Sequence, residues 1–144
     1  MRVYVAGALN GSRNAPQAMA KYEAVAEMLR EIGVEPYVPH CHSAPQLRLD
    51  HSPERIYEVD SKALAAADLL LAFLDEPSLG VGAEIALAMS LDVPVLAVWP
   101  QGSHVSPFVR GLIGSSTACL GRPYRELRDV ARFVEVKLSG GNTT

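Results

Sequence analysis

The segment Asp75–Glu84 carries residue types and a spacing that could bind an anion beside a reactive carboxylate. It follows the apolar run Leu69–Leu74 and leads into a second apolar segment, Ile85–Met89. The simplest prediction is a strand, a glycine-containing turn and a buried helix, with Glu84 at the start of that helix. A helix N-terminus offers free N–H groups and a partial positive charge, which favour an anionic ligand and keep a carboxylate ionised. The segment therefore predicts an anion site next to an ionised carboxylate.

The two glycines of this segment and its single carboxylate also have a purely structural interpretation. Gly80 and Gly82 lack Cβ, so the backbone there can take unusual dihedral angles and approach a ligand closely. Acidic residues are nevertheless common in first turns of helices, and glycines are common between strands and helices. The flanking sequence offers Glu84 no evident partner, and an ionised carboxylate in dry surroundings is costly unless it is paired or functional. This cost favours a functional site.

The composition predicts one globular domain over residues 1–138, followed by a frayed tail at 139–144. The 144 residues are 49% hydrophobic and 20% charged, which suits a single core. The formal net charge of −3 gives no general attraction to a nucleic-acid polymer or an anionic membrane, so local groups must hold any phosphate. No apolar run approaches the roughly 20 residues of a membrane-spanning helix.

The N-terminus and the cysteines predict a cytoplasmic, reduced protein. Met1–Val5 enters a strand at once, without the layout of a signal peptide. Two cysteines, Cys41 and Cys119, do not make a disulfide framework.

Several residues in one polar stretch have side chains that bind metals: His40, Cys41, His42 and His51. Adjacent residues rarely point at one ion, and no matching cysteine pair occurs elsewhere in the chain. We therefore expect no metal site.

Apolar strands alternate with amphipathic helices along the chain. Strands are expected at 3–6, 34–38, 69–74, 93–99 and 117–120, and further helices at 16–32, 53–67, 106–113 and 124–138. The alternation predicts an α/β fold of the Rossmann or flavodoxin-like type, a doubly wound parallel sheet flanked by helices. Five strands favour the order 2-1-3-4-5, with Pro36 placing the second strand at the sheet edge.

This topology predicts where a ligand would bind. The switch point lies between the first and third strands, so the loops Gly7–Arg13 and Asp75–Gly82 open into one crevice. Two glycine-bearing loops far apart in sequence thus become neighbours, which favours a site there. The crevice would bring together Tyr4, Asn10, Gly11, Arg13, Ser78, Gly80, Gly82 and Glu84.

A second carboxylate, Asp60, lies on the preceding predicted helix and can point toward the same crevice. Two carboxylates at a sugar-sized site are the usual equipment for cleaving a glycosidic bond. One attacks or stabilises the anomeric carbon, and the other transfers a proton. Ser78, the glycine N–H groups and Arg13 could hold a phosphate. The alternative for Asp60 is an ordinary solvated helix residue.

The sequence resembles the nucleoside 2-deoxyribosyltransferase superfamily, and within it the 2′-deoxynucleoside 5′-monophosphate N-glycosidases. The matching motifs span nearly the whole chain: Val3–Gly7 with Asn10–Arg13, Tyr57–Asp60, Ala66–Asp68, Pro77–Ile85 and Val105–Gly111. The stretch from Pro77 to Glu84 is the most specific of them.

The resemblance implies a role for each matching residue. Glu84 would be the nucleophile, forming a glycosyl-enzyme intermediate at C1′, and Asp60 would contact the base and assist its departure as an acid. Tyr4 would touch the sugar and the nucleophile. Gly11, Arg13, Ser78 and Ser106 would bind phosphate. The loops themselves add further candidates for substrate binding: Gly7, Asn10, Gly80 and Gly82. The resemblance also implies a homodimer or dimer of dimers in which Ser106 reaches the neighbouring site, and it implies no cofactor.

Ser78 distinguishes the branches of this superfamily. Transferases that act on unphosphorylated nucleosides typically carry an aspartate six residues before the nucleophile, where this chain has a serine. A carboxylate would repel a phosphate dianion, whereas a hydroxyl can donate to it. We therefore expect a nucleoside 5′-monophosphate as substrate, with free base and (deoxy)ribose 5-phosphate as products. Base exchange by a deoxyribosyltransferase and a non-catalytic nucleotide sensor remain alternatives, as do ribose and deoxyribose.

Overall fold

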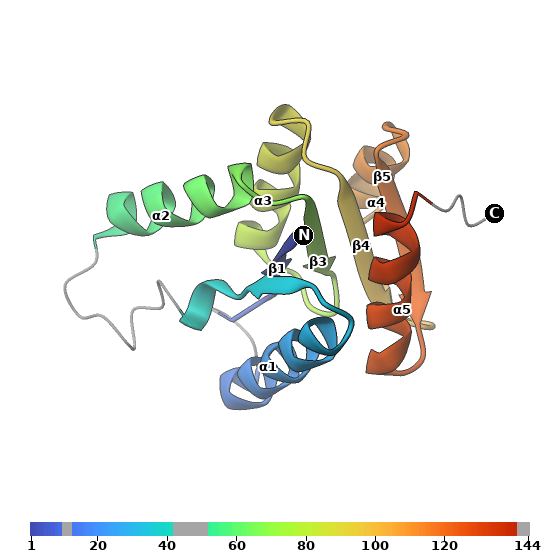
Figure 1. Cartoon of the computed structure of the whole chain (residues 1–144). Helices are drawn as coiled ribbons and strands as arrows, with labels where there is room; N and C mark the ends of the chain where they lie inside the picture. The colour runs from blue at the N-terminus through green and yellow to red at the C-terminus, as the bar shows by residue number, and fades with distance from the viewer. Residues whose placement is uncertain (10–12, 42–51, 141–144) are drawn as a thin grey trace.

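The structure of the chain is a computed structural model that describes residues 1–9, 13–41 and 52–140 (Figure 1). Five strands alternate with five α-helices and one 3₁₀ turn, η1. In chain order they are β1 (Arg2–Ala6), α1 (Ala15–Glu31), β2 (Glu35–Tyr37), η1 (Pro39–Cys41), α2 (Pro53–Ala65), β3 (Leu69–Phe73), α3 (Leu79–Ser90), β4 (Val95–Pro100), α4 (Pro107–Gly114), β5 (Cys119–Tyr124) and α5 (Leu127–Leu138).

The five strands form one parallel sheet in the order β2-β1-β3-β4-β5, which confirms the predicted fold class and topology. The switch point falls between β1 and β3, as expected. The register places Tyr4 of β1 beside Leu70 of β3 on one side and Tyr37 of β2 on the other. Pro36 lies in β2, at the edge of the sheet, where a missing N–H group is best tolerated.

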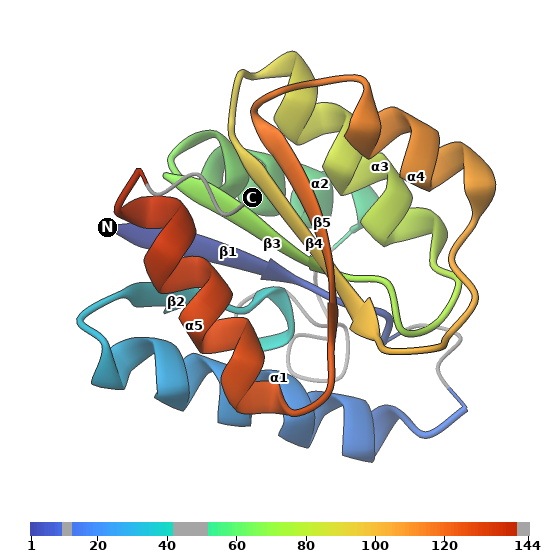
Figure 2. The same ribbon diagram turned by 90° about the vertical axis from the view of Figure 1, so that its right-hand side faces the viewer.

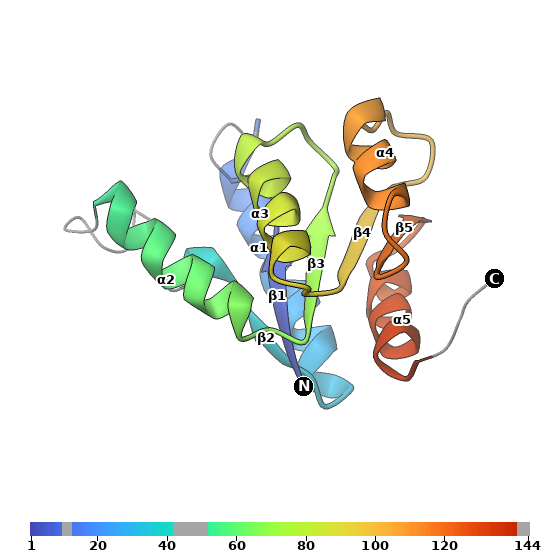
Figure 3. The same cartoon turned by 90° about the horizontal axis from the view of Figure 1, so that it is seen from above.

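Helices cover both faces of the sheet. On one face α1 and α5 pack against side chains such as Val5 and Leu71, and on the other α2, α3 and α4 pack against their alternating neighbours (Figure 2). Figure 3 shows α3 and α4 on the side of the sheet opposite α5. The central strand β3 is buried along its whole length because helices cover it on both sides, which explains its continuous apolar sequence.

The start of α3 differs from the sequence prediction. We expected a glycine-containing turn before the helix, but the helix begins at Leu79, and Gly80 and Gly82 lie within its first turn. Neither glycine is among the residues with positive φ, so the predicted unusual dihedral angles are wrong. The cause is Ser78, a favourable N-cap whose Oγ accepts a hydrogen bond from the Val81 N–H at 3.3 Å. Glu84 consequently lies in the second helical turn rather than at the helix start.

The end of the sheet also differs from the prediction. β5 continues to Tyr124, past the expected end at Leu120, and α5 begins only at Leu127. A capping box fixes this start, because the side chain of Asp129 accepts a hydrogen bond from the Glu126 N–H at 3.1 Å. The remaining strands and helices agree with their predicted ranges to within two residues at each end.

Two sequence predictions concern the ends of the chain and the membrane. α5 ends at Leu138, and of the predicted tail only Ser139 and Gly140 are among the described residues. In the described part of the chain, no helix combines the length and the apolar character needed to cross a membrane.

Candidate active site

Glu84 has a partner that lies far from it in the sequence, the tyrosine that the family resemblance placed against the nucleophile. The Tyr4 hydroxyl donates a hydrogen bond of 2.6 Å to Oε1 of Glu84. Tyr4 lies in β1 with 0% of its surface exposed, so its position is fixed by the centre of the sheet. The flanking sequence offered Glu84 no partner, and its partner comes from β1 instead, which agrees with the expected contact between Tyr4 and Glu84. The short bond orients the carboxylate and favours its ionised form.

The electrostatic environment of Glu84 also differs from the expectation. Burial raises the pKa of Glu84 from 4.5 to about 7, the Tyr4 hydrogen bond lowers it, and the nearby charge of Asp60 raises it. The helix N-terminus thus does not keep this carboxylate fully ionised, and Glu84 titrates near neutral pH. Burial and the charge of Glu84 raise the pKa of Tyr4 far above its ordinary value, so Tyr4 stays a neutral donor.

A second tyrosine–carboxylate pair lies beside the first. The Tyr37 hydroxyl donates a hydrogen bond of 2.9 Å to Oδ1 of Asp60. The rings of Tyr37 and Tyr4 are stacked, with centroids 5.3 Å apart and an interplanar angle of 27°. Sequence reasoning missed Tyr37, because its position opposite Tyr4 depends on the register of β2 against β1. The sequence signal that could have found Tyr37 is the weak edge strand that contains it, because that strand has to pair with β1.

Both carboxylates line one cavity of about 530 Å³ between α2 and α3. Its volume lies in the range of small-molecule sites. Its lining is Tyr4, Tyr57, Asp60, Ser61, Leu64, Gly80, Ala83, Glu84, Ala86, Leu87 and Ser90. Asp60 thus faces the cavity that Glu84 also lines, which favours a site residue over the alternative of an ordinary solvated position.

The predicted phosphate-binding residues of α3 lie at the helix N-terminus. Ser78, the N-cap, and Gly82 line a second cavity of about 520 Å³, whereas Gly80 lines the cavity of Glu84. A Cβ added to Gly82 would meet no atom within 4 Å, so the space in front of this turn is open. The first N–H groups of an α-helix have no partner within the helix, so this turn can accept an anion.

The residues expected from the first loop are only partly brought to the site. Gly7 follows β1 and packs under Tyr22, whose Cζ would lie 2.0 Å from an added Cβ, so packing alone requires glycine there. Arg13 lines a different cavity, on the α1 side, together with Asp75. The predictions for Asn10 and Gly11 lie outside the described residues.

Ser106 is the N-cap of α4 and lines the same cavity as Ser78. Two large apolar side chains of that cavity are almost fully exposed, Leu79 at 97% and Phe108 at 82%. An apolar surface of this kind next to polar groups often marks an interface with another molecule.

The loop that carries Ser78 is anchored by a network that the sequence analysis did not foresee. Oδ2 of Asp75 accepts hydrogen bonds from Lys21 Nζ at 2.5 Å and from the Tyr124 hydroxyl at 2.6 Å. These partners come from α1 and from the end of β5, so no local sequence pattern could indicate the contact. The network therefore joins the loop after β3 to α1 and to the end of β5.

The fold and the two tyrosine–carboxylate pairs define a doubly wound α/β protein with two carboxylates at one cavity. Residues 3–123 match the family model described as nucleoside 2-deoxyribosyltransferase. The chain belongs to this family, which confirms the resemblance seen in its motifs.

Individual relatives agree with this assignment. The chain is 32% identical over 115 residues to a Thermofilum pendens protein named 2′-deoxynucleoside 5′-phosphate N-hydrolase 1, with 78% of each chain covered. It is also 32% identical over 120 residues to the 5-hydroxymethyl-dUMP N-hydrolase of Rattus norvegicus, covering 79% of this chain and 71% of the relative. The solved CMP N-glycosidase of Clostridium botulinum has the same fold, with a TM-score of 0.68, 20% identity and coverage of 94% and 99%.

The raised pKa of Glu84 predicts a pH-dependent stability. Its folded-state pKa of about 7 exceeds the ordinary 4.5, so ionisation opposes folding, and stability is lost as pH rises between these values. At about 1.4 kcal/mol per pKa unit, the loss is about 3 kcal/mol. We expect Glu84→Gln to remove this loss, so that its stability relative to wild type increases from pH 4 to pH 8 in urea unfolding. Glu31→Gln, at an exposed position of α1, is the control. A difference between Glu84→Gln and wild type that does not change with pH would contradict the raised pKa.

Proposed function

We propose that this protein hydrolyses the N-glycosidic bond of (2′-deoxy)nucleoside 5′-monophosphates, releasing free base and (deoxy)ribose 5-phosphate. The observation that carries the proposal is the pair of carboxylates, Glu84 and Asp60, each held by a tyrosine at one nucleotide-sized cavity. Membership of the nucleoside 2-deoxyribosyltransferase family and the names of the N-hydrolase relatives support the same chemistry.

In the proposed mechanism, ionised Glu84 attacks C1′ while the bond from C1′ to the base nitrogen breaks. The Tyr4 bond occupies Oε1, which leaves Oε2 to form the new bond. The negative charges of Glu84 and Asp60 disfavour each other, so the reactive form of the pair holds one proton, on Asp60, which gives it to the leaving base. Water then attacks C1′ of the glycosyl-enzyme and returns a proton to Asp60, and Glu84 leaves as a carboxylate. Glu84, Asp60 and water supply every proton and bond change of this cycle, so the reaction needs no cofactor.

The 5′-phosphate would bind at the start of α3. Ser78 Oγ already accepts from the Val81 N–H, so its own hydrogen remains available to donate to a phosphate oxygen. The helix dipole and the open space at Gly82 favour an anion at the same point. The contributions of Gly7, Arg13 and the rest of the first loop remain predictions.

Removing the nucleophile should abolish turnover while leaving the fold and substrate binding intact. We expect Glu84→Gln to lower kcat/KM for base release from 5′-monophosphates by at least about 10³-fold, because a glutamine amide is too weak a nucleophile to form the bond to C1′. The assay is base release from a panel of ribo and deoxy 5′-monophosphates and the matching nucleosides. The wild-type rate should rise with pH as Glu84 ionises near pH 7 and fall again at higher pH, where Asp60 has also lost its proton.

Glu31→Gln serves again as the matched control. Hydrolysis by Glu84→Gln at the wild-type rate, with unchanged binding, would disprove the mechanism. The family description makes base exchange a second candidate function. Adding an acceptor base separates the two, since a transferase would form a new nucleotide where a hydrolase releases sugar phosphate.

Ser78 should set the preference for a phosphorylated substrate. We expect Ser78→Asp to lower kcat/KM for the 5′-monophosphate by about 100-fold relative to the nucleoside, because a carboxylate repels the phosphate dianion. Aspartate is also a good N-cap, so α3 should keep its start. Ser78→Ala, which removes the donor without adding charge, should have a smaller effect. An unchanged preference in Ser78→Asp would show that the phosphate does not bind there.

A homodimer or dimer of dimers is part of this proposal. Leu79 and Phe108 expose large apolar surfaces beside Ser78 and Ser106, so a second copy that covers them would bring its own residues close to the site. A cytoplasmic location also remains a prediction, which the free thiols of Cys41 and Cys119 support.

Disrupting this apolar surface should separate the copies. We expect wild type to sediment as a dimer or tetramer and Phe108→Ser to sediment as a smaller species, with weaker binding of the 5′-monophosphate. Leu91→Ser, at an exposed apolar position at the other end of α3, is the control and should keep the wild-type mass. A monomeric wild type in analytical ultracentrifugation would contradict the proposed dimer.

A further inference from the structure

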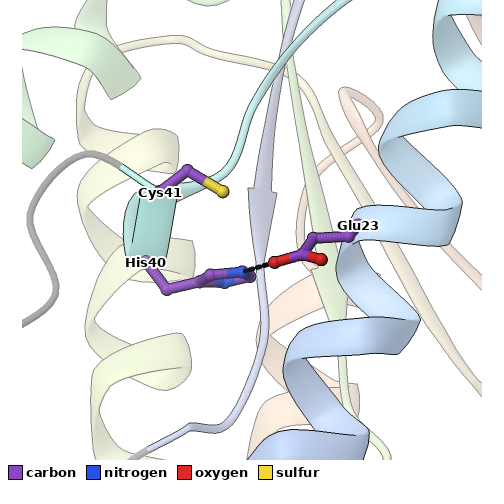
Figure 4. Close-up of side chains that lie close together, drawn as sticks. All are labelled: Glu23, His40 and Cys41. Atoms are coloured by element: carbon purple, nitrogen blue, oxygen red, sulfur yellow. Dashed lines mark hydrogen bonds and ion pairs between the residues drawn. The ribbon is translucent and has the colours of Figure 1, made fainter. Parts of the chain in front are cut away.

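Three side chains of metal-binding type meet on the α1 side of the sheet. Glu23 comes from α1, and His40 and Cys41 are consecutive residues of η1 (Figure 4). His40 Nε2 lies 3.2 Å from Glu23 Oε1, and one ligand atom from each residue lies within 4.8 Å of the others. We expected adjacent residues not to point at one ion, whereas the ligand atoms of His40 and Cys41 both lie near that of Glu23.

We propose that Glu23, His40 and Cys41 form a binding site for a divalent transition metal of the zinc class, with the remaining coordination position open to water. The site is separate from the cavity of Glu84, which lies between α2 and α3. It therefore goes beyond the proposed hydrolase activity and does not depend on it.

The set of ligand atoms fits zinc better than other common cations. An imidazole nitrogen, a thiolate sulfur and a carboxylate oxygen are all ligands that Zn²⁺ accepts, whereas Mg²⁺ and Ca²⁺ prefer oxygen alone. The two negative charges of ionised Glu23 and Cys41 balance the ion and leave no net charge beside the neutral imidazole. Ligand atoms of a tetrahedral zinc site lie about 3.3–3.8 Å apart, so separations of up to 4.8 Å between the present atoms must shorten when the ion binds.

The site is partly preorganised. The His40 side chain is only 2% exposed and packs near Tyr22, with ring centroids 6.4 Å apart, so its ring direction is fixed. The Cys41 N–H donates to the Val38 carbonyl at 3.0 Å, which fixes the turn that carries the sulfur. Glu23 is more than half exposed, so an ion can enter from solvent.

A simpler explanation of the cluster is a buried histidine that is satisfied by one carboxylate. That explanation accounts for the bond between His40 and Glu23 but gives the sulfur of Cys41 no role. The sulfur of Cys41 is therefore the atom that distinguishes a metal site from an ordinary hydrogen bond.

Cys41 is not an activated nucleophile. Burial and the charge of Glu23 raise the pKa of the Cys41 thiol, and Arg30 opposes the rise. The thiol proton leaves to solvent as the metal–sulfur bond forms. Arg30 is itself paired with Glu27, which reduces its repulsion of a cation.

The test uses Co²⁺ as a spectroscopic probe and Zn²⁺ as its competitor on the purified full chain. We expect wild type to show a thiolate-to-cobalt charge-transfer band that one equivalent of Zn²⁺ removes. Cys41→Ser should lose the band and bind Zn²⁺ about 100-fold more weakly, and Glu23→Gln should also bind more weakly. Cys119→Ser, which removes the other thiol, is the matched control and should behave as wild type.

Cys41→Ser and Glu23→Gln change exposed side chains, so circular dichroism should confirm an unchanged fold. No charge-transfer band in wild type, or equal Zn²⁺ affinity in wild type and Cys41→Ser, would overturn the proposal. Because binding is measured without substrate, failure of the metal site and failure of the hydrolase proposal are distinguishable.

Discussion

The hydrogen bond between Tyr4 and Glu84 is the constraint on which the rest of the site depends. It joins the middle of β1 to the second turn of α3, so it requires the sheet order that makes β1 and β3 neighbours and the helix start that Ser78 sets. A carboxylate placed in largely apolar surroundings needs such a donor, because burial alone would favour its neutral form. The same bond fixes the direction in which the carboxylate faces the cavity.

The sequence predicted the architecture well because the buried strands are recognisable from their apolar composition. The continuous apolar runs of β3 and β4 could only be interior strands, and the alternation with helices led to the observed order. The family followed from motifs spread along the chain. The predicted start of α3 was wrong because the prediction gave the two glycines more weight than the capping preference of Ser78. Glycine is tolerated in the first turn of a helix.

The parts of the site that were not foreseen all depend on distant contacts. Tyr37 reaches Asp60 only because β2 pairs with β1 in one particular register. The pKa of Glu84 depends on its burial and on the contacts with Tyr4 of β1 and Asp60 of α2, which no local pattern encodes. Likewise His40 and Cys41 meet Glu23 through the packing of η1 on α1. Local sequence rules predict elements, whereas these pairs arise from tertiary packing.

The burial of Glu84 has a consequence for the two halves of the proposed reaction. The glycosyl-enzyme is an ester and carries no charge on Glu84, so the apolar wall that disfavours the carboxylate accommodates the ester more easily. Forming the sugar–protein bond thereby relieves the cost of a poorly solvated anion. Release by water must restore that anion, which makes deglycosylation the step that the surroundings of Glu84 oppose. The glycosyl-enzyme should therefore live longer at this buried glutamate than it would at a fully solvated one.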